Sequence, residues 1–191
     1  MPSEERTTIR LDDPRALRAY AHPLRLSLIG MLRRNGPMTA TQCAAALDEN
    51  VPNCSFHLRQ LAKYGLAERA PAADGRERPW QATANSTSWT DDSDDPETRM
   101  AADQLNAAIL RQYVRRAEAY LAVRGEESAE WRAAAGFGDD MIYVTAEQLV
   151  DLAGRVEALL APYRDRAGRA AGSRPVTIVQ LAIPTPEEGA P

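Results

Sequence analysis

Residues 51–66, VPNCSFHLRQLAKYGL, constrain the fold most because they combine helical periodicity with two chemically different faces. Apolar residues recur at spacings of three and four: Val51, Cys54, Leu58 and Leu61. This spacing predicts a helix with one side against a core. The other side carries Asn53, Phe56, Arg59, Gln60 and Lys63. Most of these are hydrogen-bonding or cationic groups of the kind that read base edges and hold phosphates, so the stretch predicts a nucleic-acid recognition helix.

A second, shorter helix is predicted just before the recognition helix. Thr39 and Gln42 have the spacing of a capping box, in which the hydroxyl and the amide side chain each accept a hydrogen bond from the other residue's backbone N–H. The helix should therefore cover about residues 40–47, and Asn50 is suited to cap the recognition helix after a short connection. Two helices joined by a tight turn, the second polar on its outer side, predict a helix-turn-helix.

A β-hairpin is predicted directly after the recognition helix. Gly65 is suited to end that helix in the left-handed conformation that glycine adopts easily. The extended runs 66–69 and 76–83 then flank a glycine-containing loop, which is typical of a hairpin. Arg76 and Arg78 would lie near its tip, so the hairpin would form a basic wing.

Two further helices are predicted upstream, over residues 14–20 and 24–34. They are separated near Pro23, because proline disfavours the helical conformation in the residue before it. Together with the helix-turn-helix and the hairpin, they predict a winged helix-turn-helix domain over residues 12–88. An acidic linker, 89–96, would follow.

Three segments of this region resemble a known family. They are AHPLRLSLI at 21–29, SFHLRQL at 55–61 and YGLAER at 64–69, and they resemble the ArsR-type winged-helix transcriptional regulators over roughly the first 90 residues. The resemblance implies a homodimeric DNA-binding regulator with its recognition helix in the major groove. Ser55 and His57 match the Ser-x-His-Leu core of the family motif. The metal-sensing branch carries a Cys-x-Cys pair on the helix before the turn, where this chain has only Cys43, so metal sensing is not implied.

The predicted DNA-binding residues lie on the helix-turn-helix and the wing. Arg59 and Gln60 are expected to contact bases or phosphates, and Ser55 and Lys63 are expected to contact the DNA backbone. An arginine of the wing is expected to reach the adjacent minor groove. His57 could contact DNA or form an inward hydrogen bond. The full predicted set is Thr41, Gln42, Asn53, Ser55, Phe56, His57, Arg59, Gln60, Lys63, Arg76 and Arg78.

The distribution of charge agrees with a DNA-binding N-terminal half, although the whole chain has a formal net charge of −4. Residues 1–89 contain 12 Lys and Arg against 9 Asp and Glu, a net of +3, whereas residues 90–191 contain 11 against 18, a net of −7. The modest positive charge predicts that affinity depends on a few placed cations, with a correspondingly modest salt dependence.

The sequence offers little for catalysis or for a bound metal. It contains no glycine-rich phosphate loop, Gly-x-Ser-x-Gly elbow or His-Glu-x-x-His motif, so we expect neither an enzyme nor a cofactor. A zinc site from Cys43, Cys54 and His57 is disfavoured because two of the three lie on apolar stripes and four ligands are normally required. With no apolar run long enough to span a bilayer and no signal-peptide core, the expected location is cytoplasmic.

The second half, 97–184, is expected to serve dimerisation or sensing. A long helix over about 96–123 carries two apolar stripes, which require more than one packing partner. Leu110, Val114 and Leu121 form one stripe. The other is the predicted dimer interface: Leu105, Ile109, Tyr113, Ala117 and Tyr120. The alternative is a monomer whose own helices cover both stripes.

The last third predicts a small α/β unit. A capping box at Thr145 and Gln148 opens a helix, and the segments 141–144 and 176–183 are strand candidates rich in β-branched residues. The chain ends, to about Arg10 and from Pro184 onward, are expected to fray. The fold class is thus mainly α with small β: an N-terminal winged helix-turn-helix and a C-terminal helical or α+β region.

Aromatic residues in this half suggest a small-molecule effector pocket. The candidate lining residues are Tyr113, Tyr120, Trp131, Phe137 and Tyr143. The alternative use of this half is dimerisation alone.

The function predicted from the sequence is a homodimeric operator-binding regulator. A repressor is favoured because repression requires only occupancy of an operator. The competing class is a winged-helix protein-interaction module that does not bind DNA, since the outward Phe56 suits a protein partner and the acidic pair 48–49 would repel phosphates that it faced.

Overall fold

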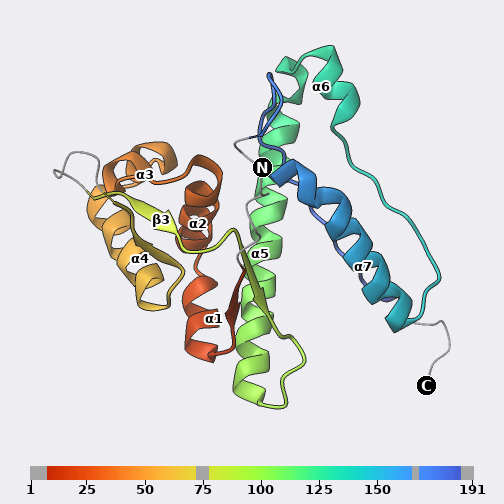
Figure 1. Ribbon diagram of the computed structural model, residues 1–191, viewed down its shortest axis with the longest axis horizontal. Helices are drawn as coiled ribbons and strands as arrows, with labels where there is room; N and C mark the ends of the chain where they lie inside the picture. The colour runs from red at the N-terminus through yellow and green to blue at the C-terminus, as the bar shows by residue number, and fades with distance from the viewer. Residues whose placement is uncertain (1–7, 72–77, 165–167, 186–191) are drawn as a thin grey trace.

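The computed structural model describes residues 8–71, 78–164 and 168–185 of the chain, and most of them are helical (Figure 1). In chain order the elements are β1 (Thr8–Leu11), α1 (Pro14–Tyr20), α2 (Pro23–Asn35), α3 (Ala40–Leu47), α4 (Val51–Lys63), β2 (Ala67–Arg69), β3 (Trp80–Ala82), β4 (Ser86–Trp89), α5 (Pro96–Val123), α6 (Ala129–Ala134) and α7 (Ala146–Leu160), with 3-10 turns at Arg124–Glu126 and Ala161–Arg164. The predicted fold class, mainly α with small β and an N-terminal winged helix-turn-helix, is confirmed.

Two small sheets complete the N-terminal unit. β2 and β3 pair antiparallel and form the base of the predicted wing, and Met38 adds a bridge to Trp80. β1 pairs parallel with β4, from Thr8 beside Ser86 to Leu11 beside Trp89. The prediction that the chain frays to about Arg10 is therefore wrong for residues 8–10, while residues 1–7 lie outside the described residues. The strand is ordered by its pairing with β4, 78 residues away, and by Leu11, which is buried in the core. We call β1 to β4, with the intervening helices, the winged unit.

The helix ends follow the predicted capping chemistry. Thr39 and Gln42 form both hydrogen bonds of the capping box, and Asn50 accepts from the backbone N–H of Asn53 at 2.8 Å. Gly65 has φ of +71° and ends α4. The N–H groups of Gly65 and Leu66 donate to carbonyls in the last turn of α4, each at 3.0 Å, which satisfies groups that a helix end would leave unpaired.

The core lies within the winged unit and the first half of α5. Its buried hydrophobic side chains run from Leu11 to Ala108, and the largest fully buried ones include Leu17, Leu28, Ile29, Leu58 and Leu61. α1 packs along α5, so the long helix is part of the same core at its N-terminal end. Asp95, predicted to cap this helix, accepts from the N–H groups of Glu97 and Thr98. The linker before it is held in place, because Arg10 donates to Thr90.

The two stripes of α5 have different environments. Leu105 of the predicted dimer interface has 0% exposure and belongs to the core of its own chain, so its assignment to a subunit interface is wrong. Ile109, Tyr113, Ala117 and Tyr120 are half-buried. Leu110, Val114 and Leu121 are 46–48% exposed. The first stripe therefore packs toward the winged unit, while the second remains accessible.

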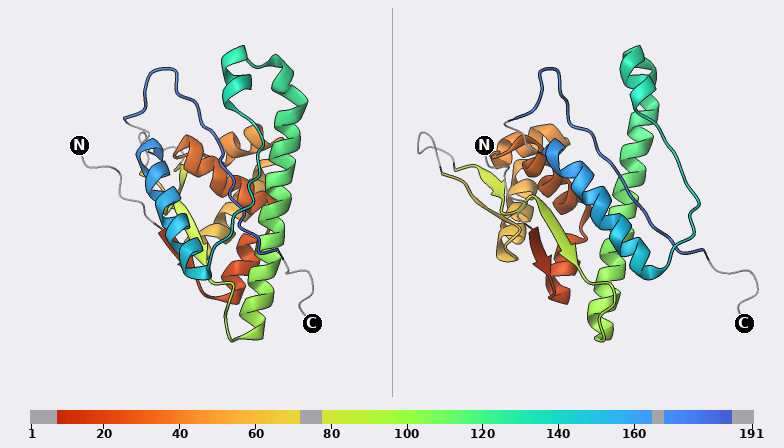
Figure 2. Two further views of the ribbon diagram at one scale, coloured as in Figure 1. Left: turned by 90° about the vertical axis from the view of Figure 1, so that its right-hand side faces the viewer. Right: turned by 45° about the vertical axis from the view of Figure 1, so that its right-hand side comes forward.

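Residues 127–164 and 168–185 form an extended C-terminal arm rather than the predicted α/β unit. The helix predicted after Thr145 is confirmed as α7, with both capping-box hydrogen bonds. The strand predictions for 141–144 and 176–183 are wrong, because both segments are extended but unpaired (Figure 2). A β-branched sequence makes a strand only where another strand accepts its hydrogen bonds. Neither segment makes a backbone hydrogen bond to any part of the chain that the structure describes.

Candidate nucleic-acid interface

The recognition helix α4 presents one buried and one exposed side. Cys54, Leu58 and Leu61 are at most 1% exposed and fix the helix on the core. On the other side Phe56 is 48% exposed, and Arg59 and Lys63 are exposed. Spacings of three and four residues put these three side chains on one face. We call Phe56, Arg59 and Lys63 the outer face of α4.

Asn53, Ser55 and Gln60 are half-buried at the edges of the outer face. The amide of Asn53 donates to the carboxylate of Glu49 at 3.0 Å. This contact engages one of the two acidic residues that precede α4. Asp48, the other, is the αL residue that ends α3, with φ of 52°. The acidic pair therefore has a structural role in the turn of the helix-turn-helix.

His57 does not belong to the outer face. It is only 7% exposed, its ring lies 4.3 Å from that of His22, and its Nδ1 lies 3.2 Å from the guanidinium of Arg25. The prediction that His57 contacts DNA is therefore wrong, and the inward alternative holds. The period of α4 turns this residue toward the α1–α2 junction, where it finds polar partners.

Burial lowers the pKa of both histidines below the ordinary value of 6.5. For His57 the further causes are the neighbouring His22 and the charge of Arg25, which together outweigh the opposing effect of Glu49 on its pKa. For His22, burial again comes first among the causes that lower its pKa, followed by Arg25. His22 also uses Nδ1 to accept from the N–H of Leu24, which caps α2 in its neutral form.

Arg25 is the residue of this cluster that sequence reasoning did not single out. It donates to the carbonyl of Ala19 and approaches His57, so it joins α1, α2 and α4. It stands in the run 21–29 that carries the family resemblance. The position of Arg25 three residues after His22, on the first turn of α2, was thus the available sign.

The helix before the turn exposes Thr41 and Gln42. The side-chain oxygen of Gln42 accepts from the N–H of Thr39 at 2.8 Å, so the capping box fixes this residue at the start of α3. Both predicted residues therefore lie at the surface of α3, the first helix of the helix-turn-helix.

The wing carries cationic groups at its described base. Arg78 is exposed, and its carbonyl accepts from Arg69. The guanidinium of Arg69 lies 4.0 Å from the ring centroid of Trp80, a cation–π contact that orients it along the hairpin. Arg76 was also predicted to contact DNA, and it lies outside the described residues.

Cys43 and Cys54 are both completely buried with reduced thiols. Burial raises the pKa of Cys43 to about 11, and burial also raises the pKa of Cys54. Their thiols are thus held in the neutral form that packs like a small apolar side chain. Among the described residues, no group of three or more His, Cys, Asp or Glu side chains is arranged to hold a metal ion.

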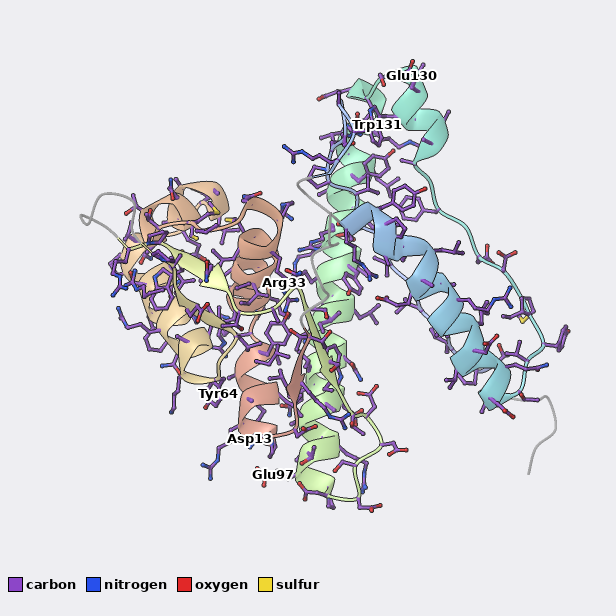
Figure 3. All side chains as sticks on the ribbon, in the orientation of Figure 1. Asp13, Arg33, Tyr64, Glu97, Glu130 and Trp131 are labelled. Atoms are coloured by element: carbon purple, nitrogen blue, oxygen red, sulfur yellow. The ribbon has the colours of Figure 1, made fainter. Side chains whose placement is uncertain are left out.

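The candidate effector residues are spread over α5, α6 and the extended segment between α6 and α7. Phe137 is 67% exposed and Tyr143 is 95% exposed. Trp131 lies at α6 (Figure 3), where Arg174 covers its ring at 3.8 Å. Tyr113 and Tyr120 are half-buried on α5. The effector pocket stays a prediction from the sequence.

The comparisons with known proteins agree with this geometry in its central part. Residues 20–70, from the end of α1 to the start of the wing, match the family model described as a helix-turn-helix domain. The chain thus carries a helix-turn-helix domain. No curated protein matches the chain in sequence. None of the described helices is long and apolar enough to cross a membrane.

A mutant of MarR from E. coli is among the similar solved structures. The two chains are 14% identical, and the alignment covers 77% of this chain and 87% of the other with a TM-score of 0.32. A TM-score of that size does not establish a common fold.

Proposed function

We propose that this protein is a sequence-specific DNA-binding transcriptional regulator of the ArsR type that acts as a homodimeric repressor. The observation that carries the proposal is the outer face of α4. Its buried side is locked on the core, while a guanidinium and an ammonium group project from the other side of the second helix of a helix-turn-helix. That helix is the one such domains place in the major groove.

The proposed contacts follow from exposure. Arg59 would read a base or hold a phosphate, and Lys63 would hold a phosphate, since a lysine acts there as a point charge. Ser55 and Gln60, at the edges of the outer face, would add hydrogen bonds. Arg78, and Arg76 beyond the described part of the wing, would approach the adjacent minor groove. Thr41, Gln42 and Asn53 would contact the DNA phosphate backbone near the turn between α3 and α4.

A dimer would place two such helices on one operator. Its twofold axis requires two half-sites about one helical turn apart. The exposed residues of α5 support a subunit contact there, and occupancy of an operator is sufficient for repression.

The test compares binding to the chain's own promoter and to a random duplex of equal length, at two salt concentrations. We expect tighter binding to the promoter, weakening with salt. Arg59→Ala should cost about 1–3 kcal/mol and relax specificity at one base pair if Arg59 reads a base. Lys63→Ala should weaken binding to all sequences and reduce the salt slope by about 1.

A matched control is Arg155→Ala, which removes a 74% exposed arginine from α7. It should leave DNA affinity unchanged, because it changes net charge equally but lies outside the helix-turn-helix. Equal weak binding to both duplexes by the unaltered protein would overturn the proposal. It would instead favour the protein-interaction module, for which the 48% exposed Phe56 would be the contact.

A further inference from the structure

The C-terminal arm exposes apolar side chains along its whole length. Phe137, Met141, Tyr143, Leu159 and Tyr163 are 67–95% exposed, and none of the described residues of the arm is buried. α7 has an apolar side as regular as that of α4, yet Leu149, Leu152, Val156 and Leu160 are only half-covered. This many exposed large apolar side chains in one segment are typical of an interaction site.

The accessible surface area of the whole chain also indicates an interaction site. It is 13797 Å². A folded monomer of this mass, 20.9 kDa, is expected to expose about 9,000 Å². The chain thus exposes about half as much again as a compact monomer of its mass, so it has enough accessible surface for a subunit interface.

The exposed stripe of α5 is a matching apolar surface. Leu110, Val114 and Leu121 lie on one side of the helix, away from the winged unit, and are 46–48% exposed. Because the helix rises 1.5 Å per residue, this stripe is roughly 17 Å long, close to the roughly 17 Å between Leu149 and Leu160 on α7. The two helices therefore offer apolar strips of equal length.

The charges around these two surfaces are opposite. Residues 105–124 contain four Arg and one Glu, a net of +3. Residues 127–160 contain seven acidic and two basic residues, a net of −5. The part of the arm up to the end of α7 is therefore acidic, and it would be attracted by the basic flanks of α5 and repelled by an anionic membrane surface.

We propose that the arm of one copy packs across the exposed stripe of α5 in a second copy, and that the second arm does the same in return. The twofold symmetry of a homodimer makes this exchange reciprocal. The segments 141–144 and 176–183, which are unpaired within one chain, then become shielded from solvent at the subunit interface. Arg174 anchors the returning end of the arm, since it pairs with Glu127 at 2.8 Å and stacks on Trp131.

A second copy fits better than closure onto the same chain. In the described structure, α7 makes its main contacts with the 3-10 turn that follows it, and Figure 1 shows it on the opposite side of α5 from α3 and α4. The arm is already folded at its helices, but none of its described side chains is fully buried. In a symmetric dimer, the exposed stripe of α5 in each copy can cover the arm of the other copy.

The test uses the full chain without DNA. Sedimentation should give twice the chain mass of 20.9 kDa. Amides of 141–144 and 176–183 should be protected from hydrogen exchange at high protein concentration and lose protection on dilution. Val114→Asp places a carboxylate in the stripe and should raise the dimer dissociation constant about tenfold or more, with loss of the same protection. Leu121→Asp should act alike.

A matched control is Gln104→Asp, which adds the same charge to an exposed position of α5 outside the stripe. It should leave the dimer and its exchange protection unchanged. Circular dichroism that matches the unaltered chain shows that each variant is folded. Protection that survives dilution and Val114→Asp would overturn the proposal in favour of an arm closed on its own chain. A dimer with unprotected segments, or a monomer with unprotected segments, would overturn it as well.

The inference rests on the homodimer of the proposed function, but the two can fail separately. If the arms exchange and the dimer does not bind its promoter, only the DNA-binding proposal fails. If a monomeric Val114→Asp variant and the unaltered chain bind the promoter alike, the exchange is not what places the two recognition helices.

Discussion

The winged unit and the C-terminal arm are built from similar sequence signals but end in opposite states. Both contain a Thr-x-x-Gln capping box, which begins α3 in the winged unit and α7 in the arm. Both also contain an amphipathic helix, α4 or α7, and short segments with β-branched residues. In the winged unit these elements bury Leu58 and Leu61 completely. In the arm none of the described side chains is buried. A periodic pattern therefore predicts which side of a helix seeks a partner, but not whether the partner lies in the same chain.

Truncation of a leucine side chain should affect the two regions very differently. Leu58→Ala removes a fully buried side chain of α4 and should lower the free energy of unfolding of the winged unit by about 2–5 kcal/mol. Leu159→Ala removes an equal volume from a 72% exposed position on α7 and should change that free energy by less than about 0.5 kcal/mol. Urea unfolding followed by circular dichroism measures both.

Protein concentration sharpens this result. The cost of Leu58→Ala should be independent of concentration, because its contacts are within one chain. Any effect of Leu159→Ala should be on the association of the two copies, and it should therefore depend on protein concentration. A large loss from Leu159→Ala in a chain kept monomeric by Val114→Asp would mean that α7 packs on its own winged unit.

The helices of the winged unit were predictable because each end is determined locally. Thr39, Asn50 and Gly65 provide the hydrogen bonds or the backbone conformation that a helix end requires, and all three are recognisable in the sequence. β1 was not predictable. It depends on β4, 78 residues away, and although its four residues alternate between polar and apolar, so short a run is a weak strand signal by itself.

The candidate site was predictable in its exposed members and less so at its edge. Arg59 and Lys63 follow from helical spacing alone. His57 does not, because its spacing puts it at the border between the two sides of α4, and only Arg25 and His22 show which way it turns. The strands predicted in the arm failed for a related reason, since no other segment that the structure describes supplies the backbone groups that would pair with them.

The two capping boxes test the comparison with smaller changes. Thr39→Ala removes the cap of α3 and should lower the stability of the winged unit by about 0.5–2 kcal/mol. Thr145→Ala removes an identical cap from α7, where the hydrogen-bond distances are the same. It should reduce helix content in the arm and leave unfolding of the winged unit unchanged, because a helix without a covered face frays on its own. Equal effects on the winged unit would mean that α7 is coupled to its core.

The smallest expected effect is the change in stability with pH. It should be confined to the winged unit, because both histidines of the chain lie there. The folded unit lowers the pKa of His22 and of His57, so between those values and about 6.5 the unfolded chain binds more protons. Stability is complete above pH 6.5 and is lost as the pH falls through the folded-state pKa values. The effect is small because half-buried His22 keeps some hydration when charged.

Urea unfolding at pH 7.5 and 6.0 measures this loss. His22→Asn with His57→Gln should abolish it, since asparagine can still cap α2 and glutamine can still accept from Arg25. The dimer dissociation constant should not change over the same interval, because the arm has no histidine. An equal loss of stability in the double variant would assign the pH dependence to carboxylates. A dimer that weakened with the winged unit would show that the two regions depend on each other.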